Sequence, residues 1–463
     1  MRQLITSRFF IAVIAFGALS LLAGWMKLCA VAAADFPYYS WTAWAIDDFL
    51  HRKTPAKIVF VGSSLVLVPL CGVDADFLQQ KLDGSEHHQS VYFERKFAEK
   101  TGLNVPTFNF ALPGEMPSDA YMITSFLLKG DKRPDVIVYG IGPRDFMDNL
   151  LPSPAATDPY RFLSRFGDVS PFASLMMPDW FERMSFEAGR ALYLYGHKQE
   201  IAQKFVARAG KEFNRDAPWL FSAVPVTSDV RHQLLPDYQA FALGHGEAFF
   251  RPSTPEDHAK FVDNLAEYKK RYKNLKRETY ETQMRFFTEA LATAKARGVH
   301  AIVVAMPITD INRRLLSDAN WDMYRTNIKT IAHDQGATFV DFNNDRSFKQ
   351  SDFGDTVHLH SGGGKLWLDK LIDRLAADHD VLASLEERER PVRTAELNGP
   401  LRAGRPRSTE SGLPPAGTIA GSGLKPAATI AGSGLPPAAT SARVAAGSSP
   451  LSQRQLAGKG GAL

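Results

Sequence analysis

The chain contains very little cysteine and carries little net charge. Its two cysteines are Cys29 and Cys71. Cys29 falls in an apolar N-terminal leader, so we expect no structural disulfide, and two cysteines this far apart give no zinc-site spacing. The formal net charge of +4 is small for 463 residues. This balance argues against a nucleic-acid binder and against a strongly anionic partner.

Charge is missing altogether from one stretch near the N-terminus. Residues 9–26 hold no charged side chain, and about 18 or more such residues are long enough to cross a bilayer. Arg2 and Arg8 precede the run, which favours an N-terminus inside and the remaining chain outside. Small residues at Ala32 and Ala34 also offer sites for signal peptidase. We therefore expect a single-pass cell-membrane anchor with an extracytoplasmic body, or a secreted or periplasmic protein if the leader is cleaved; a buried core helix is the remaining alternative.

Aromatic residues gather directly after this leader. Tyr38, Tyr39, Trp41 and Trp44 lie in a connector that we expect to be short or helical. Such side chains suit the membrane interface. Packing against the folded body would use them equally well, and the sequence leaves both alternatives open.

Five short apolar runs predict the strands of a parallel sheet that is buried on both faces. They span residues 57–61, 105–111, 135–141, 300–307 and 337–342. Helical stretches precede several of them. The longest runs from Pro255 to Gly298, with Thr254 as its N-cap and the glycine as its stop. The alternation predicts a three-layer α/β/α, doubly wound, flavodoxin-like fold with about five parallel strands.

Two segments depart from this alternation. An insertion at residues 146–250 is rich in proline and aromatics and has short helical signals. We expect it after the third strand, at the carboxyl edge of the sheet, where it would cover or shape a site. The C-terminal segment repeats SGLPPAGTIAG-like units without aromatics, so we expect disorder there. The expected divisions are a leader at 1–34, a connector at 35–55, an α/β domain at 56–390 that includes the insertion, and a tail at 391–463.

A glycine and two serines end the first predicted strand, in KIVFVGSSLV (57–66). A glycine at a strand end permits a sharp turn, and open α/β sheets place ligands at that carboxyl edge. Alone, the pattern is typical of a helix cap or a phosphate contact. No GK[ST] follows, which excludes a P-loop. For Ser64 to act as a nucleophile, the chain must supply a base and a group that orients the base.

Both groups stand together in DTVHLHSGGG, where Asp355 and His358 are three residues apart before an apolar helix. This loop step can bring the carboxylate beside one imidazole nitrogen while the other nitrogen faces outward. The alternatives are a solvated loop histidine and a metal pair formed with His360. Because no second cluster of His, Cys or acidic residues stands out, we expect neither a metal nor a cofactor.

Glycine turns follow the second and third predicted strands. NFALPG (109–114) ends at Gly114, whose amide can be offered unhindered to an oxyanion. GPRDF (142–146) contains Arg144 and Asp145. Taken singly, the first segment is an ordinary turn and the second is a turn closed by a surface ion pair.

The order of these four blocks resembles that of the SGNH/GDSL hydrolase superfamily. The resemblance covers about residues 55–380 and leaves the insertion unmatched. DTVHLHSGGGKLWL resembles the family's final block, D-x-x-H-L before an apolar helix. GSSL resembles G-D-S-L with Ser63 where Asp is usual, a register that makes Ser64 the nucleophile. NFALPG resembles N-x-G-x-x-G, with Ala111 replacing the first glycine and Gly114 matching the oxyanion glycine.

The resemblance carries specific roles over to this chain. It implies catalytic Ser64, His358 and Asp355, an oxyanion hole of Ser64, Gly114 and Arg144, and substrate binding by Asn109 and Asp145. The third block departs from the family's G-x-N-D, because Arg144 stands in the Asn position. Arginine can still donate and adds positive charge for an anionic intermediate or substrate. It can equally turn to a carboxylate, which would leave only the two backbone amides.

The implied function is that of a serine-dependent esterase or acyltransferase acting on an acylated carbohydrate or another ester. The GSS variant and the leader resemble extracytoplasmic branches that O-acetylate exported polysaccharides, and the D-alanyl transfer protein of the lipoteichoic-acid pathway. That likeness implies membrane contact through the N-terminal segment and a membrane-bound partner that donates the acyl group. The alternative, favoured by the Arg144 change, is a catalytically inactive scaffold or glycan-binding protein that kept the fold.

Overall fold

The protein was analysed as a computed structural model, which describes residues 8–26, 41–198, 201 and 250–387. The predicted cleavage sites, Tyr38 and Tyr39, the later part of the insertion and the tail lie outside the described residues.

A five-stranded parallel sheet forms the centre, in the order β2-β1-β3-β4-β5. The strands are β1 Ile58–Gly62, β2 Thr107–Asn109, β3 Val136–Ile141, β4 His300–Ala305 and β5 Thr338–Asp341. Val59 of β1, for example, is paired with Phe108 on one side and Ile137 on the other. This order is that of flavodoxin-like sheets. The five predicted strands and the doubly wound α/β class are confirmed.

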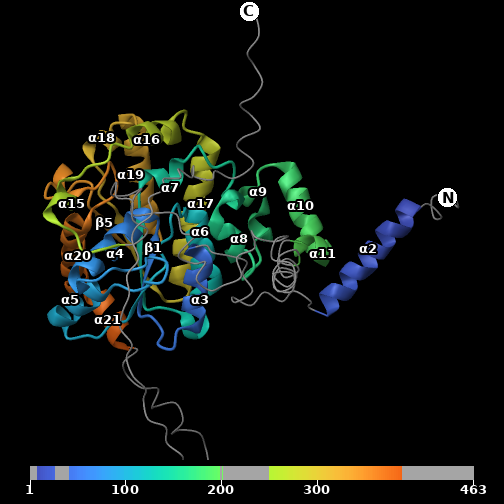
Figure 1. Ribbon diagram of the computed structural model, residues 1–463, viewed down its shortest axis with the longest axis horizontal. Helices are drawn as coiled ribbons and strands as arrows, with labels where there is room; N and C mark the ends of the chain where they lie inside the picture. The colour runs from blue at the N-terminus through green and yellow to red at the C-terminus, as the bar shows by residue number, and fades with distance from the viewer. Residues whose placement is uncertain (1–7, 27–40, 199–200, 202–249, 388–463) are drawn as a thin grey trace, which may run out of the picture. The chain divides into compact units, whose positions relative to one another are not determined.

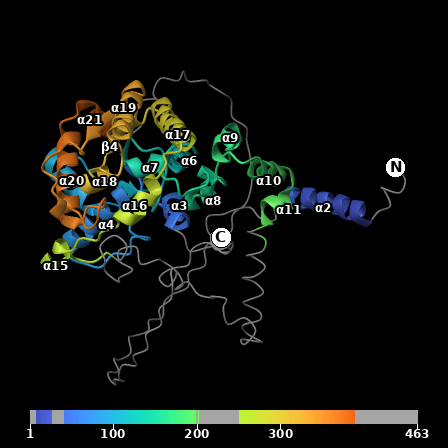
Figure 2. The ribbon, with the colours of Figure 1, turned by 90° about the horizontal axis from the view of Figure 1, so that it is seen from above.

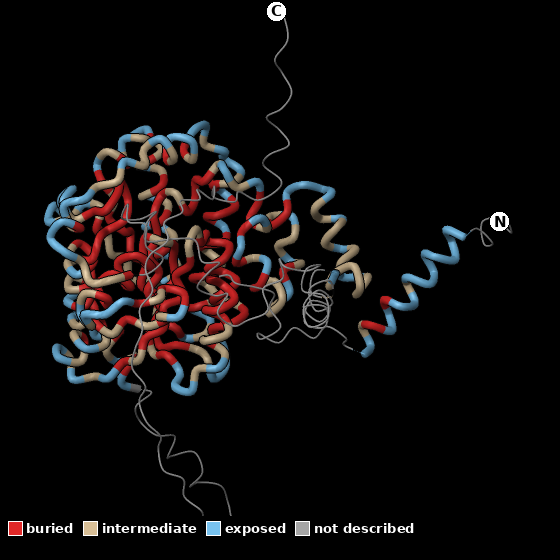
Figure 3. Tube along the Cα trace, in the orientation of Figure 1, coloured by how far each residue is buried: buried red, intermediate tan, exposed pale blue. Residues whose placement is uncertain are grey.

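Helices cover both faces of the sheet (Figures 1 and 2). One face carries α4 Ser64–Leu78, α5 Val91–Thr101, α20 Ser361–Ala376 and α21 His379–Glu387. The other face carries α6 Pro117–Met122, α17 Arg277–Ala296 and α19 Asp318–Asp334. The buried segments run through the layers between them (Figure 3), and β1, β2 and β3 are buried along their whole length. Strands covered on both faces read as continuous apolar runs, which makes them recognisable in the sequence.

The strand order reverses at β1, which lies between β2 and β3. In open α/β sheets a ligand crevice forms at such a point, beyond the carboxyl ends of the strands. Gly62 ends β1 with φ +144°, and a Cβ there would lie 2.4 Å from the carbonyl oxygen of Gly140 on β3. Glycine is therefore required where the chain turns from β1 into the crevice.

The stretch predicted as one long helix is divided into α15 Pro255–Ala259, α16 Leu265–Tyr272 and α17. Its ends were predicted correctly, because Thr254 caps α15 and Gly298 follows α17 with φ +65°. The prediction of a continuous helix is wrong. The amide of Val262 donates to the carbonyl of Gly354 at 2.8 Å, and Asn274 adopts φ +57°. These two breaks separate α16 from its neighbours in the chain.

Near the N-terminus, α2 Arg8–Trp25 is long and apolar enough to cross a membrane, and a signal sequence passes the same test. Only 11% of it is buried, so the alternative of a core helix is excluded. In the connector, α3 Trp41–His51 buries Trp41 and Trp44 in the hydrophobic core. For these two residues, packing on the folded body is confirmed.

The described part of the insertion is helical. It contains α8 Asp158–Leu163, α9 Ala173–Met176, α10 Trp180–Ala191 and α11 Tyr193–Gly196. Helix α8 packs against α3 and α6. Two further short helices, α7 Pro143–Met147 and α18 Asp310–Arg313, follow β3 and β4.

Candidate active site

Ser64 is the first residue of α4, directly beyond the turn that ends β1. Ser63 is the N-cap in extended conformation (φ −81°, ψ −165°), and its carbonyl accepts from the amides of Val66 and Leu67. Its side chain makes no capping bond. Ser63 is thus a cap by position, as predicted, while the Ser64 side chain is free to face the crevice.

Three side chains distant in sequence meet at this point. His358 Nε2 lies 2.8 Å from Ser64 Oγ, and His358 Nδ1 lies 2.6 Å from Asp355 Oδ2. Both Asp355 and His358 are buried. Because a carboxylate only accepts, Nδ1 carries the hydrogen and Nε2 is left to accept the hydroxyl hydrogen of Ser64. The structure therefore brings together all three residues predicted to be catalytic.

The loop itself fixes the orienting carboxylate. Asp355 Oδ1 accepts from the amides of Val357 at 2.8 Å and His358 at 2.7 Å. Asp355 also forms a bridge with Val262, the residue in the first break of the divided helix. The carboxylate thus has little freedom to leave the imidazole.

His360 has a different role from either alternative considered for this loop. Its Nδ1 accepts from the amides of Gly362 at 3.0 Å and Gly363 at 3.3 Å, and its Nε2 donates to the Ser351 carbonyl at 2.6 Å. It is the N-cap of α20. Within the described ranges, no group of three or more His, Cys, Asp or Glu residues could hold a metal ion.

A cavity of about 110 Å³ opens over Ser64. Its lining includes Ser64, His358, Gly114, Arg144, Tyr268 and Tyr272. The insertion was expected to cover or shape the site. None of its described residues lines the cavity, and α16 lines it instead. Sequence reasoning missed this wall because it treated α16 as the middle of a longer helix.

Two main-chain amides at the cavity are available as donors. Gly114 has φ +75°, a conformation that favours glycine. Within the described part of the chain, neither its amide nor that of Ser64 donates a hydrogen bond. The Ser64 amide belongs to the first turn of α4, where amides have no partner inside the helix. The position predicted for the oxyanion hole therefore has two unused donors.

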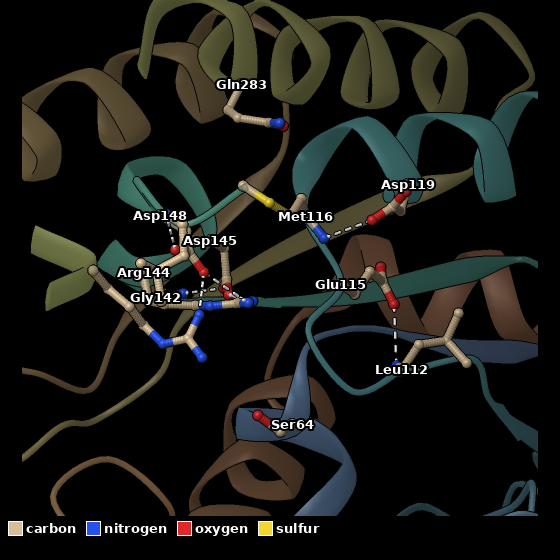
Figure 4. A network of polar contacts seen from close by, with 12 residues as sticks. Ser64, Leu112, Glu115, Met116, Asp119, Gly142, Arg144, Asp145, Asp148 and Gln283 are labelled. Atoms are coloured by element: carbon tan, nitrogen blue, oxygen red, sulfur yellow. Dashed lines mark hydrogen bonds and ion pairs between the residues drawn. The ribbon is translucent and has the colours of Figure 1, made fainter. Parts of the chain in front are cut away.

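Arg144 lies at the same cavity. Its Nη2 is 2.9 Å from Asp148 Oδ2, and its Nη1 is 3.7 Å from Asp145 Oδ1. A Cβ on Gly114 would lie 3.5 Å from Nη2, so the guanidinium faces the oxyanion glycine. Figure 4 shows it between the Ser64 side chain and the two carboxylates. Arg144 thus pairs with two carboxylates yet stays in the site. The expected pair with Asp145 is present, but it is buried and does not lie on the surface.

Asp145 shapes the turn after β3. Its Oδ2 accepts from the amide of Gly142 at 2.8 Å and so caps α7. Burial raises its pKa to about 6, against the lowering effects of Arg144, the Gly142 amide and the Ser63 hydroxyl. Asp145 lines the cavity, as a substrate-binding residue would, and it also stabilises the start of α7.

Two further buried acids, missed in the sequence, hold the turn after β2. Glu115 accepts from the Leu112 amide at 3.2 Å, and burial raises its pKa well above the usual range. Asp119 accepts from the Met116 amide at 3.0 Å and the Thr157 hydroxyl at 2.7 Å, and burial raises its pKa to about 7. The signal for Asp119 was an acid three residues after a helix N-cap.

Asn109, predicted to bind substrate, does not line the cavity. It is the last residue of β2 and is 1% exposed. Its Oδ1 accepts from the Ala111 amide at 3.0 Å. The side chain therefore stabilises the turn that leads to Gly114.

A hydroxyl, an imidazole base and spare donors thus line one small cavity, and the orienting carboxylate of Asp355 is buried behind the imidazole. This set of groups is suited to attack on a carbonyl carbon and to stabilising the oxyanion that results. Comparison with models of protein families and with curated proteins gives no match for this chain.

Proposed function

We propose that this protein is a serine-dependent esterase or acyltransferase that works through an acyl-enzyme. The observation that carries the proposal is the 2.8 Å contact between Ser64 Oγ and His358 Nε2, with Asp355 on the other imidazole nitrogen. Ser–His pairs of this kind lower the barrier to nucleophilic attack by taking the hydroxyl proton as the bond forms.

In the first half-reaction, Ser64 Oγ attacks the ester carbonyl carbon while His358 Nε2 takes the hydroxyl proton. Asp355 holds the imidazole in place and stabilises its positive charge. The amides of Ser64 and Gly114, together with Arg144, donate hydrogen bonds to the oxyanion. Collapse breaks the bond to the alcohol, which leaves with the proton from His358, and the acyl group stays on Ser64.

The second half-reaction repeats these steps with a new nucleophile. Water or a sugar hydroxyl gives its proton to His358 and attacks the acyl carbon. Collapse returns the proton to Ser64 and releases an acid or a new ester. Hydrolysis and transfer therefore share the first half and differ only in what enters the cavity.

The size of the cavity and the leader guide the choice of substrate. A volume of about 110 Å³, walled by Tyr268, Tyr272 and Ile308, favours a short acyl group. A membrane-spanning or export function of α2 would place the site outside the cytoplasm. The substrate we propose is an O-acyl ester of a cell-surface glycan, and for transfer a membrane-bound partner would supply the acyl group.

A fluorophosphonate probe tests the nucleophile directly. We expect the detergent-solubilised full-length chain to take one label at Ser64, located by mass spectrometry of peptides. Ser64→Ala and heat-unfolded protein should take none. Native protein without label, or Ser64→Ala labelled as well as the wild type, would favour the scaffold or glycan-binding alternative.

A further inference from the structure

A fully buried carboxylate, Asp148, lies behind the candidate oxyanion hole between two arginines. Its Oδ2 is 2.9 Å from Arg144 Nη2 and also pairs with Arg271 Nη1. Its Oδ1 accepts from the Leu150 amide at 2.9 Å. Only a charged carboxylate can accept all of these donors at once, because an amide side chain has a single acceptor oxygen.

The second arginine comes from the helix that walls the cavity. Arg271 lies on α16, and its Nε is 3.0 Å from Glu267 Oε1 one turn earlier. The Arg271 side chain is 21% exposed, whereas that of Asp148 is 0% exposed. A chain of charges therefore runs from α16 through Asp148 to Arg144 on α7.

This arrangement leaves one nitrogen of Arg144 without a hydrogen bond. Nη1 is buried and has no hydrogen-bond partner among the described residues. A Cβ on Gly114 would lie 3.9 Å from Nη1 and 3.5 Å from Nη2, and the carboxylate nearest Nη1 is that of Asp145, with Oδ1 at 3.7 Å. Arg144 and Gly114 line the cavity together with Ser64. A buried donor without an acceptor is unfavourable, so an acceptor that arrives only during reaction would be stabilised by it.

We propose that Asp148 and Arg271 are positioning residues that anchor Arg144 Nη2, so that Nη1 donates to the oxyanion formed on Ser64. The inference rests on the proposed acyl-enzyme function. An untethered arginine side chain loses rotamer entropy when it is held in one geometry. Because the guanidinium is planar, holding Nη2 in place also fixes the direction in which Nη1 points. The Nη1 donor is therefore oriented before the reaction begins.

A neutral ester separates this role from recognition of an anionic substrate. With p-nitrophenyl acetate, we expect Arg144→Ala to lower kcat about 10²-fold, the usual effect of losing one oxyanion donor, with little change in KM. Arg144→Lys should lose as much, because an ammonium bound to Asp148 keeps the charge but has no second fixed donor. An unchanged kcat in Arg144→Ala would overturn the donor role.

The anchor is tested by Asp148→Asn. We expect kcat to fall about tenfold with little change in KM, because Arg144 is present but no longer held. Asp341 offers a matched control: its Oδ2 is 2.5 Å from Arg325 Nη2, and its Oδ1 accepts from the amide two residues later. Asp341→Asn should leave kcat unchanged, and a wild-type kcat in Asp148→Asn would overturn the anchor.

Chemical rescue keeps the inference testable if Asp148→Asn folds poorly. Guanidinium chloride at millimolar concentration should restore part of the kcat of Arg144→Ala, because Asp148 and Arg271 still define the binding place. The same salt should not restore kcat in the double variant Arg144→Ala/Asp148→Asn. In Arg144→Ala/Arg271→Met it should restore kcat less than in Arg144→Ala. Equal rescue with and without Asp148 would overturn the anchor. Absence of Ser64-dependent turnover in the wild type would instead overturn the proposed function, and this inference with it.

Discussion

Two serine–histidine pairs with almost the same spacing occur among the described residues. Ser64 Oγ lies 2.8 Å from His358 Nε2, and Ser361 Oγ lies 2.9 Å from His258 Nε2. A search for short serine–histidine distances would return both. Their surroundings differ, and the difference shows what the distance alone does not supply.

The first pair has an orienting group and open space. Asp355 hydrogen-bonds the far nitrogen of His358, and Ser64 lines a cavity that also holds spare amide donors. In the second pair, Ser361 is buried and its hydroxyl also lies 2.7 Å from Ser253 Oγ. Among the described residues, the side-chain hydrogen bond of His258 is to Ser361 and not to a carboxylate.

The histidine beside the second pair supports a structural role. The rings of His258 and His360 are stacked, with centroids 4.4 Å apart and planes at 7°. His360 caps α20, and Ser361 is the first residue of that helix. The second pair thus joins α15 to the start of α20, whereas the first pair has the groups required for chemistry.

The largest expected contrast is between the two serines. Ser64→Ala should lower kcat for p-nitrophenyl acetate by about 10⁴-fold or more, because the attacking oxygen is gone. Ser361→Ala should keep the wild-type kcat, since it removes only the buried hydrogen bonds to His258 and Ser253. Steady-state kinetics on both variants check this. A comparable loss in Ser361→Ala would mean that the second pair takes part in the reaction.

The orienting carboxylate should have the next largest effect. Asp355→Asn should lower kcat about 10³- to 10⁴-fold, because an amide can donate to Nδ1 and so favours the wrong tautomer of His358. Thermal unfolding should show a folded protein, since the amide oxygen can still accept from the loop amides. A kcat within tenfold of the wild type would mean that the two pairs differ less than their surroundings suggest.

The first pair was predictable from the sequence and the second was not. Ser64, Asp355 and His358 each stand in a short block next to a strand end or helix start, where parallel sheets place their sites. The strands themselves were predictable because burial on both faces leaves continuous apolar runs. His258, by contrast, looked like an ordinary polar residue of a long helix.

What the sequence could not supply depends on tertiary contacts. The break that frees α16 depends on Val262, whose amide bonds to Gly354 ninety or so residues away along the chain. Arg271 and Asp148 are 123 residues apart, and such a pairing has no periodic signal. Asn109 matched a family motif, yet its side chain turned to the local backbone, because a motif specifies a residue type and not the direction of its side chain.

His360, which stacks on the histidine of the second pair, predicts that folding stability depends on pH. Burial, and to a lesser extent His258, lower the pKa of His360 from 6.5, while the Ser351 carbonyl, Asp352 and Asp76 act against this. The unfolded chain then binds more protons than the folded one just below pH 6.5, so stability should fall as pH decreases through that range. Burial is the main physical cause, and a protonated Nδ1 also could not accept from the amides of α20.

Urea unfolding at pH 7.5 and at pH 5.5 measures this dependence. His360→Asn keeps an N-cap acceptor and removes the titration, so its midpoint should change less between the two pH values. His360→Ala should cost about 1 kcal/mol at pH 7.5, where the neutral cap is intact. A pH dependence that persists undiminished in His360→Asn would show that other groups cause it.

The smallest effect is expected for substitution of His258, the histidine of the second pair. His258→Gln keeps a polar group near Ser361 but removes the ring that stacks on His360, and should lower the free energy of unfolding by about 0.5–1.5 kcal/mol. Its kcat should equal that of the wild type, because His258 contacts neither Ser64 nor its base. Loss of turnover without loss of stability would break the comparison, since it would assign chemistry to a histidine that has no orienting carboxylate. Loss of stability with turnover intact would sharpen it: of two histidines at the same distance from a serine, one stabilises a helix start, and the other, held by Asp355 beside an open cavity, acts as a base.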